Sequence, residues 1–312
     1  MSNHGADCCS VIQEEYVSVI CKVLGCDKKD IVDVEISKSG MTNRSYTFSV
    51  NGKKYIMRIP GEGTDLLVNR KEEAEVYAII KHKNICEDLC YINAENGLKI
   101  SAFVEDSRCC NPYDAADLIK CMRRLRDFHN MKLEVGHTFN IYEKIDFYES
   151  LRSKKSVFDD YEQTKRDVLS LKKYIDVCNP QFFLTHIDAV PDNFLFSRTA
   201  DGKEDIRLID WEYAGMQDPH VDIAMFCVYS LYKERKHIDR LIDIYFENTC
   251  TAQNRIKIYC YIALCGLLWS NWCEYKRSLG VEFGEYALLQ YEFAREYYAL
   301  AVSEMREIGV SL

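Results

Sequence analysis

The sequence predicts an α+β protein of two lobes, a small lobe built on strands and a larger lobe built mainly from helices. Residues 30–105 carry short runs in which apolar and polar residues alternate, as half-buried strands do. From Tyr113 onward apolar residues recur at helical spacing, interrupted by a strand-rich segment from Phe182 to Trp211. With 312 residues, the chain is long enough for two lobes, each with its own core.

The first half of the small lobe predicts a helix and a hairpin. Residues 13–24 space their apolar side chains as a helix does, and residues 32–36 alternate apolar with polar side chains. Two further alternating runs, Tyr46–Val50 and Tyr55–Ile59, flank Asn51-Gly52. An Asn-Gly pair between two such runs is a strong hairpin signal, because both residues tolerate positive φ.

The second half of the small lobe predicts one longer helix and two more strands. Residues 69–83 have helical spacing, and short apolar runs follow near residues 89–92 and 99–104. We therefore place the N-terminal lobe at residues 1–105 and the C-terminal lobe at residues 106–312.

Composition narrows the classes of function. The formal net charge of −9 disfavours nucleic acid and anionic lipid as partners. No apolar run is long enough to span a bilayer, and the first ten residues lack the pattern of a secretory signal. The 15 cysteines are scattered and include no C-x-x-C pair, which favours reduced thiols. We expect a cytoplasmic protein that does not insert into membranes.

One segment carries the strongest chemical signal. Residues 184–195 contain the pattern H-x-D-x-x-x-x-N, formed by His186, Asp188 and Asn193, and a second apolar run ends at Asp210. Phosphoryl transfer needs an acceptor for the hydroxyl proton and hard oxygen ligands for magnesium. We assign Asp188 as the base and positioning group, and Asn193 and Asp210 as magnesium ligands. We expect His186 to be structural.

These motifs resemble the choline kinase branch of the aminoglycoside phosphotransferase and choline kinase superfamily, which is related to protein kinases. Residues 39–43, Ser-Gly-Met-Thr-Asn, match the family's glycine-containing turn over the nucleotide. Arg58 matches the basic residue of the third strand, and Glu73 matches its helix partner. The resemblance covers roughly residues 30–300. It implies a kinase-like bilobal fold, with a small antiparallel sheet and one main helix in the N-terminal lobe.

The resemblance also implies how ATP and Mg²⁺ are bound. Arg58 would contact the phosphates and Glu73 would hold it by an ion pair, while backbone groups near residues 102–104 would face adenine. The sequence contains no G-x-x-x-x-G-K-[ST] motif, which excludes a P-loop enzyme. The expected nucleotide-binding residues are Gly40, Met41, Thr42, Asn43, Arg58, Glu73, Phe103 and Val104.

The acceptor is predicted from the aromatic C-terminal region. In choline kinases aromatic faces surround a quaternary ammonium group, because ring quadrupoles attract cations. The family's Leu-Trp-Ser helix corresponds to residues 268–270 here. Besides Asp188, the expected acceptor-binding residues are Tyr213, Tyr229, Trp269 and Trp272.

Two departures from the family pattern affect this site. Many relatives carry a further tryptophan one turn before Trp269, where this chain has Cys265-Gly266. Tyr229 stands where an acidic residue is often found, and Trp272 or Tyr232 are candidates for compensation. At the catalytic loop, Ile187 replaces an Asn that relatives often have.

The sequence therefore predicts an ATP- and Mg²⁺-dependent kinase that phosphorylates the hydroxyl of choline or ethanolamine. A kinase for another amine-bearing alcohol, such as an aminoglycoside or amino sugar, is the nearest alternative. Two alternatives are not kinases: a metal hydrolase using His186, Asp188 and Asp210, and a nucleotide-binding pseudokinase that acts as a scaffold. The sequence makes no prediction about oligomeric state.

Overall fold

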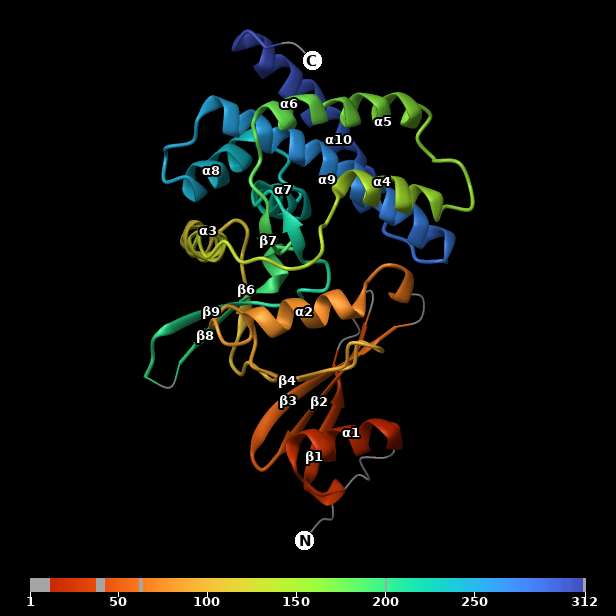
Figure 1. Cartoon of the computed structure of the whole chain (residues 1–312), viewed down its shortest axis with the longest axis vertical. Helices are drawn as coiled ribbons and strands as arrows, with labels where there is room; N and C mark the ends of the chain where they lie inside the picture. Colours follow the sequence, from red (N-terminus) through yellow and green to blue (C-terminus); the bar gives the residue numbers. More distant parts are fainter. Residues whose placement is uncertain (1–11, 38–42, 62–63, 200, 311–312) are drawn as a thin grey trace. The chain divides into compact units, whose positions relative to one another are not determined.

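The computed structural model describes residues 12–37, 43–61, 64–199 and 201–310 (Figure 1). The chain forms two compact units, Met1–Cys109 with Asn193–Tyr213, and Cys110–Asp192 with Ala214–Leu312. The first unit contains most of the strands and the second most of the helices. A division of the functional lobes at residue 105 stays a prediction.

The first unit contains the helices α1 (Glu14–Leu24) and α2 (Arg70–Ile80) and the strands β1 (Ile31–Ile36), β2 (Asn43–Val50), β3 (Lys53–Pro60), β4 (Leu89–Ile92), β5 (Lys99–Ala102), β6 (Arg108–Cys109), β8 (Phe194–Arg198) and β9 (Glu204–Leu208). The second unit contains β7 (Phe183–Thr185), β10 (Gly215–Gln217), α3 (Ala115–Asn130), α4 (Ile141–Ser150), α5 (Tyr161–Ser170), α6 (Lys172–Val177), α7 (His220–Tyr229), α8 (Arg235–Tyr245), α9 (Ala252–Ser278) and α10 (Glu285–Glu307). Short 3₁₀ turns cover Lys28–Asp30, Thr64–Leu66 and Pro191–Asn193.

The first unit is organised by a five-stranded antiparallel sheet in the order β1-β2-β3-β5-β4. The predicted hairpin is confirmed: Val50 pairs with Lys53, and the turn residues Asn51 and Gly52 have φ values of 52° and 75°. Positive φ at both central positions matches the right-handed twist of the flanking strands. The predicted helices and strands of this region are all present.

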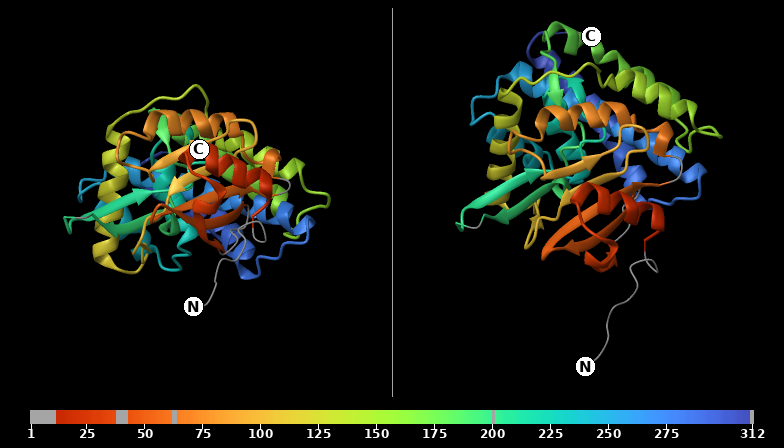
Figure 2. Two further views of the ribbon diagram at one scale, coloured as in Figure 1. Left: turned by 90° about the horizontal axis from the view of Figure 1, so that it is seen from below. Right: turned by 60° about the horizontal axis from the view of Figure 1, so that its bottom comes forward.

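The two faces of this sheet have different chemistry, because successive side chains of a strand point to opposite faces. On one face Met57 and Ile100 join Val17 of α1 in a buried apolar cluster. On the other face the neighbouring residues Arg58 and Lys99 contact side chains of α2. The sheet thus lies between α1 and α2 (Figures 1 and 2), and its polar face is the one turned toward α2.

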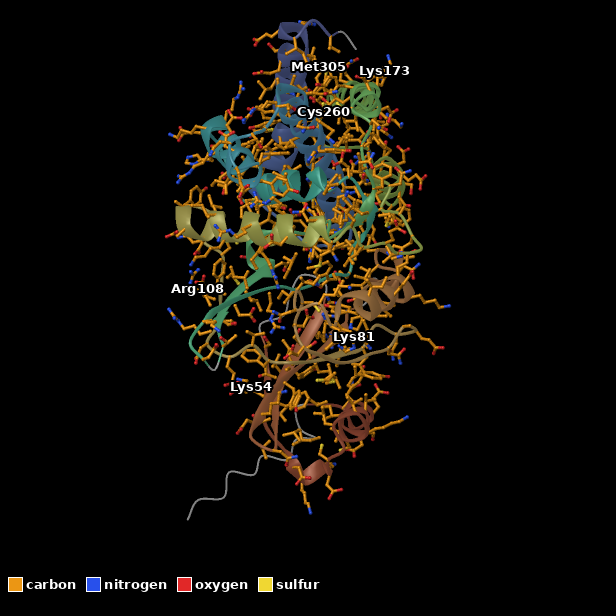
Figure 3. All side chains as sticks on the ribbon, turned by 60° about the vertical axis from the view of Figure 1, so that its left-hand side comes forward. Lys54, Lys81, Arg108, Lys173, Cys260 and Met305 are labelled. Carbon is orange, nitrogen blue, oxygen red and sulfur yellow. The ribbon has the colours of Figure 1, made fainter. Side chains whose placement is uncertain are left out.

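A second, smaller sheet pairs β6, β8 and β9 in the first unit. Phe194 of β8 pairs with Leu208 of β9. The neighbouring residues Asn193 and Ile209 therefore lie close together at one end of the hairpin. Arg108 of β6, labelled in Figure 3, places its guanidinium 4.5 Å from the centre of the Phe196 ring. This hairpin joins the two segments predicted to carry Asn193 and Asp210.

The second unit is helical, as the sequence predicted, and its largest contact joins α9 to α10 (Figure 1). At Gly266 the two helices approach so closely that a Cβ would lie 2.6 Å from the carbonyl oxygen of Gln290. Only glycine fits there, because the obstructing atoms belong to the backbone. Among the residues that the structure describes, no helix is long and apolar enough to cross a bilayer.

Candidate active site

Arg58 lies at the centre of a buried network of charges in the first unit. Its Nη2 atom donates a 2.7 Å hydrogen bond to Glu73, and its Nη1 atom lies 3.4 Å from carboxylate oxygens of Asp210 and Glu212. Burial raises the pKa of Glu73, but the charges of Arg58, Lys99 and Arg70 together outweigh it, so the pKa lies below its usual value. The structure therefore forms the expected Arg58–Glu73 pair and connects it to Asp210.

Glu212 is a site residue that the sequence reasoning missed. Its carboxylate accepts hydrogen bonds from Arg58 and Arg70, each at 3.4 Å, and from Asn43 at 3.3 Å. Burial, followed by the charge of Asp210, raises the pKa of Glu212 to about 7. Alternation along a strand does not explain why the two carboxylates share this place, because β9 ends at Leu208 and Asp210 has a φ of 66°.

Asn193 and Asp210 are brought together at one end of the β8–β9 hairpin. The backbone amide of Ile209 donates a 2.9 Å hydrogen bond to the carbonyl oxygen of Asn193. Asp210 has a positive φ of 66°, and its side chain is 34% exposed. Amide and carboxylate oxygens are hard ligands of the kind Mg²⁺ prefers, so this pair fits the predicted metal.

The loop that carries Asp188 is anchored in the second unit. It follows β7, and the carboxylate of Asp222 on α7 accepts hydrogen bonds from the backbone amides of His186 at 3.0 Å and Ile187 at 2.7 Å. Asp222 is fully buried and also lies 2.9 Å from Nε2 of His129. His186 is itself fully buried, as a structural role requires.

Ile187 is strained within this loop. Its φ of 71° is a left-handed conformation that costs a β-branched residue about 1–2 kcal/mol. An Asn would tolerate this conformation better than the β-branched Ile187 does. The hydrogen bond to Asp222 offsets the strain here, and Asp188 follows directly. Asp188 belongs to the second unit and Asp210 to the first.

Of the predicted nucleotide-binding residues, Gly40, Met41 and Thr42 lie outside the described part of the chain. Phe103 donates its backbone amide to the carbonyl oxygen of Lys54 at 3.0 Å, and Lys54, labelled in Figure 3, places its amine 4.8 Å from the Phe103 ring centre. The carbonyl oxygen of Val104 accepts a 2.8 Å hydrogen bond from Ser107. Within the described residues, no group accepts a hydrogen bond from the backbone amide of Val104, so this amide is available to a ligand.

Five aromatic rings of the second unit form a continuous series, which we name the aromatic arc: Tyr229, Trp269, Trp272, Phe283 and Tyr286. The centres of successive rings are 5.5 Å apart for Trp269 and Trp272, 5.1 Å for Trp272 and Phe283, and 6.5 Å for both Phe283 with Tyr286 and Tyr286 with Tyr229. Trp272 is 3% exposed, whereas the other four rings are partly accessible.

Acidic groups lie at one end of this arc. Burial, together with the charge of Asp188 among other neighbours, raises the pKa of Tyr286 well above its usual value. The hydroxyl of Tyr229 donates a 2.6 Å hydrogen bond to Asp192. The structure therefore places three predicted acceptor-site residues, Tyr229, Trp269 and Trp272, in one arc, and it adds Phe283 and Tyr286.

The departures from the family pattern have structural reasons. Position 266 lies where α9 and α10 touch, so a tryptophan there is incompatible with this packing. Tyr232 does not join the arc, because its hydroxyl donates to the carbonyl oxygen of Pro112. Tyr213 belongs to the first unit and is buried next to Glu212.

Comparison with known proteins identifies the relatives of this chain. The model of the choline/ethanolamine kinase family matches residues 34–294. The chain belongs to this family. It is 27% identical over 273 residues to Protein LicA of Haemophilus influenzae, covering 83% of this chain and 78% of that protein. It is thus a phosphotransferase whose acceptor is an alcohol group.

Solved structures of relatives have the same fold. The choline kinase LicA from Streptococcus pneumoniae superposes with a TM-score of 0.78 at 27% identity, over 92% of this chain and 99% of that one. LicA in complex with AMP superposes with a TM-score of 0.76, also at 27% identity, over 92% of this chain and 98% of that one. The predicted kinase-like α+β fold is therefore confirmed, and so is the predicted family.

Proposed function

We propose that this choline/ethanolamine kinase family member transfers the γ-phosphoryl group of ATP to the hydroxyl of choline, with ethanolamine as a second acceptor. The observation that carries the choice is the aromatic arc with Asp188 and Asp192 near one end. Aromatic faces attract a quaternary ammonium without needing hydrogen-bond donors from it. An aminoglycoside presents many hydroxyl and ammonium groups, which a surface of aromatic rings leaves unpaired.

Asp188 accepts the proton of the acceptor hydroxyl as that oxygen attacks the γ-phosphorus. Its position is set by the anchoring of His186 and Ile187 to Asp222, which fixes the loop before the substrate arrives. A carboxylate at this position also orients the hydroxyl for in-line attack. The leaving group is ADP.

Arg58 positions the phosphates of ATP. A guanidinium offers a planar fork of donors that matches phosphate oxygens, and Glu73 holds it in place. The backbone amide of Val104, for which the described residues offer no acceptor, donates to the adenine ring. The relative solved with AMP supports nucleotide binding in this fold.

Asn193 and Asp210 are the residues that would hold magnesium, because backbone pairing brings their two segments together at one end of the β8–β9 hairpin and both side chains carry hard oxygen ligands. When bound, Mg²⁺ neutralises charge on the phosphates. Arg58, which lies 3.4 Å from Asp210, compensates the charge of this carboxylate. The location in the cytoplasm stays a prediction from the sequence.

A coupled assay of ADP release tests the function, with choline, ethanolamine, amino sugars and aminoglycosides as acceptors. We expect choline to give the highest kcat/KM. Asp188→Asn should lower kcat by about 10²–10⁴-fold with little change in ATP binding, because only proton acceptance and orientation are lost. Asp176→Asn, an exposed carboxylate on α6, is the matched control. Preference for an aminoglycoside, or full activity of Asp188→Asn, would refute the proposal.

A further inference from the structure

The Tyr229–Asp192 hydrogen bond is a feature that phosphoryl transfer itself does not require. Asp192 precedes Asn193 and lies on the surface, whereas Tyr229 ends α7, so the 2.6 Å bond joins residues far apart in the sequence. Its short length is typical of a hydroxyl donating to an ionised carboxylate. By donating this hydrogen bond, Tyr229 holds the carboxylate of Asp192 next to the aromatic arc.

The contacts of Tyr229 link this carboxylate to the arc. The Tyr229 and Tyr286 rings meet edge to face, with an interplanar angle of 70°. Phe283 and Trp272 continue the series to Trp269 at the far end. Tyr229 therefore contributes an aromatic surface, and its hydroxyl holds the carboxylate of Asp192 beside that surface.

We propose that Asp192, held by Tyr229, is the residue that makes the acceptor site select a cationic alcohol over a neutral one. This inference rests on the proposed function and assigns the charge selection of the same site to one carboxylate. The hydrogen bond brings a carboxylate of the catalytic loop to the Tyr229 end of the aromatic arc.

The two carboxylates, Asp188 and Asp192, have different tasks. Asp188 is committed to the acceptor hydroxyl and its proton, so it is not a lasting counter-charge once the proton has moved. Asp192 takes no part in the proton transfer and interacts with the ammonium group at a distance, through a region that rings partly shield from water. Such shielding strengthens attraction between charges relative to bulk water.

The test compares choline with dimethylbutanol, its neutral analogue in which a quaternary carbon replaces the nitrogen. For the wild-type enzyme we expect a clear preference for choline in kcat/KM. Asp192→Asn should lower kcat/KM for choline by about ten-fold, mainly through KM, and leave that for dimethylbutanol unchanged. Tyr229→Phe should produce a smaller loss of the same selectivity, about three-fold, because the carboxylate remains but is no longer held.

Two controls separate charge selection from damage to the loop. Asp192→Glu keeps the charge and should restore most of the preference for choline, and Asp176→Asn removes a charge at an unrelated surface site of the same unit. Equal losses on choline and dimethylbutanol in Asp192→Asn would overturn the inference and leave the proposed function standing. A wild-type enzyme that phosphorylates neither choline nor ethanolamine would overturn both.

Discussion

Asp222 accepts a 2.7 Å hydrogen bond from the backbone amide of Ile187, a β-branched residue held at a φ of 71°. A buried carboxylate on α7 therefore stabilises a strained turn directly before Asp188. Strain of this kind persists only when the surrounding structure fixes the backbone, and it is concentrated at functional sites. The hydrogen bond to Asp222 thus connects the core of the helical unit to the position of the proposed base.

Asp222→Asn should disturb the catalytic loop more than it disturbs ATP binding. The amide has one acceptor oxygen, so one of the two backbone amides of residues 186 and 187 loses its partner, at a cost of about 1–3 kcal/mol. We expect kcat to fall at least ten-fold and the unfolding free energy, measured by urea titration, to fall by that cost. Asp243→Asn, at a partly exposed ion pair on α8, should change neither quantity appreciably. An unchanged kcat would show that the anchor does not set the loop.

Glu73→Gln tests the buried charge network of the first unit. Glu73 is 1% exposed and accepts hydrogen bonds from both Arg58 and Arg70. Removing one charge of a buried pair costs about 3–5 kcal/mol, because the remaining cations lose compensation. We expect the unfolding free energy at pH 7 to fall by about that amount and the KM for ATP to rise several-fold as Arg58 loses its orientation.

The pH dependence gives this prediction a sign. The pKa of Glu73 is lowered on folding, so its contribution to stability is present above the unfolded value of about 4.3 and is lost as the pH falls through the folded value. The difference between wild type and Glu73→Gln should therefore shrink in acid. Glu72→Gln, a neighbour in the first turn of α2, is the matched control. A constant difference down to low pH would contradict the assigned cause.

Trp269→Ala tests the aromatic arc. Trp269 is partly accessible, and its indole nitrogen lies 3.1 Å from the sulfur of Met225, which orients the ring. A desolvated cation–π contact contributes up to about 2 kcal/mol, so the KM for choline should rise by about 5–30-fold. The KM for ATP should change little. Tyr297→Leu, an aromatic residue packed on Tyr259 outside the arc, should lower stability without changing the KM for choline. Equal effects of Trp269→Ala on both substrates would indicate a damaged core.

Local patterns in the sequence were sufficient for the elements and the main chemistry. The alternating runs around Asn51-Gly52 predicted the hairpin, and the spacing of Asp188, Asn193 and Asp210 predicted a phosphoryl-transfer motif. Asp222 and Glu212 were missed for different reasons. Asp222 acts on a loop 35 residues earlier in the chain, and no local pattern encodes that contact. Glu212 lies beyond the end of β9, where no periodic pattern applies, and its burial among two arginines depends on the tertiary fold.

The aromatic region shows the same limit. The sequence predicted Trp269 through a family motif and Trp272 as a candidate for compensation. Phe283 and Tyr286 join the arc because the turn after α9 returns the chain to it. Gly266 could not be interpreted from the sequence, since the reason for glycine lies in the backbone of α10. Contacts between helices decide which aromatic residues form the arc and which belong to the core.

His220 predicts a further pH dependence of stability. It is the first residue of α7, and its ring contacts Tyr245 and Phe246. Burial lowers its pKa to about 4; the charge of Asp218 opposes this, but Lys257 lies 2.6 Å from that carboxylate and neutralises much of it. His220 is therefore neutral in the folded protein at neutral pH.

The sign follows from the two protonation states. Between the folded pKa of about 4 and the unfolded value of about 6.5, the unfolded chain binds more protons. The contribution of His220 to stability is thus complete above about pH 6.5 and declines as the pH falls toward 4, by at most about 3 kcal/mol. His220→Gln cannot titrate, so its unfolding free energy in urea should fall less steeply over this interval. Parallel pH profiles of the unfolding free energy for the two proteins would contradict a neutral, buried His220. A flatter profile for the variant would assign the loss of stability in acid to the start of α7, the helix that also carries Asp222.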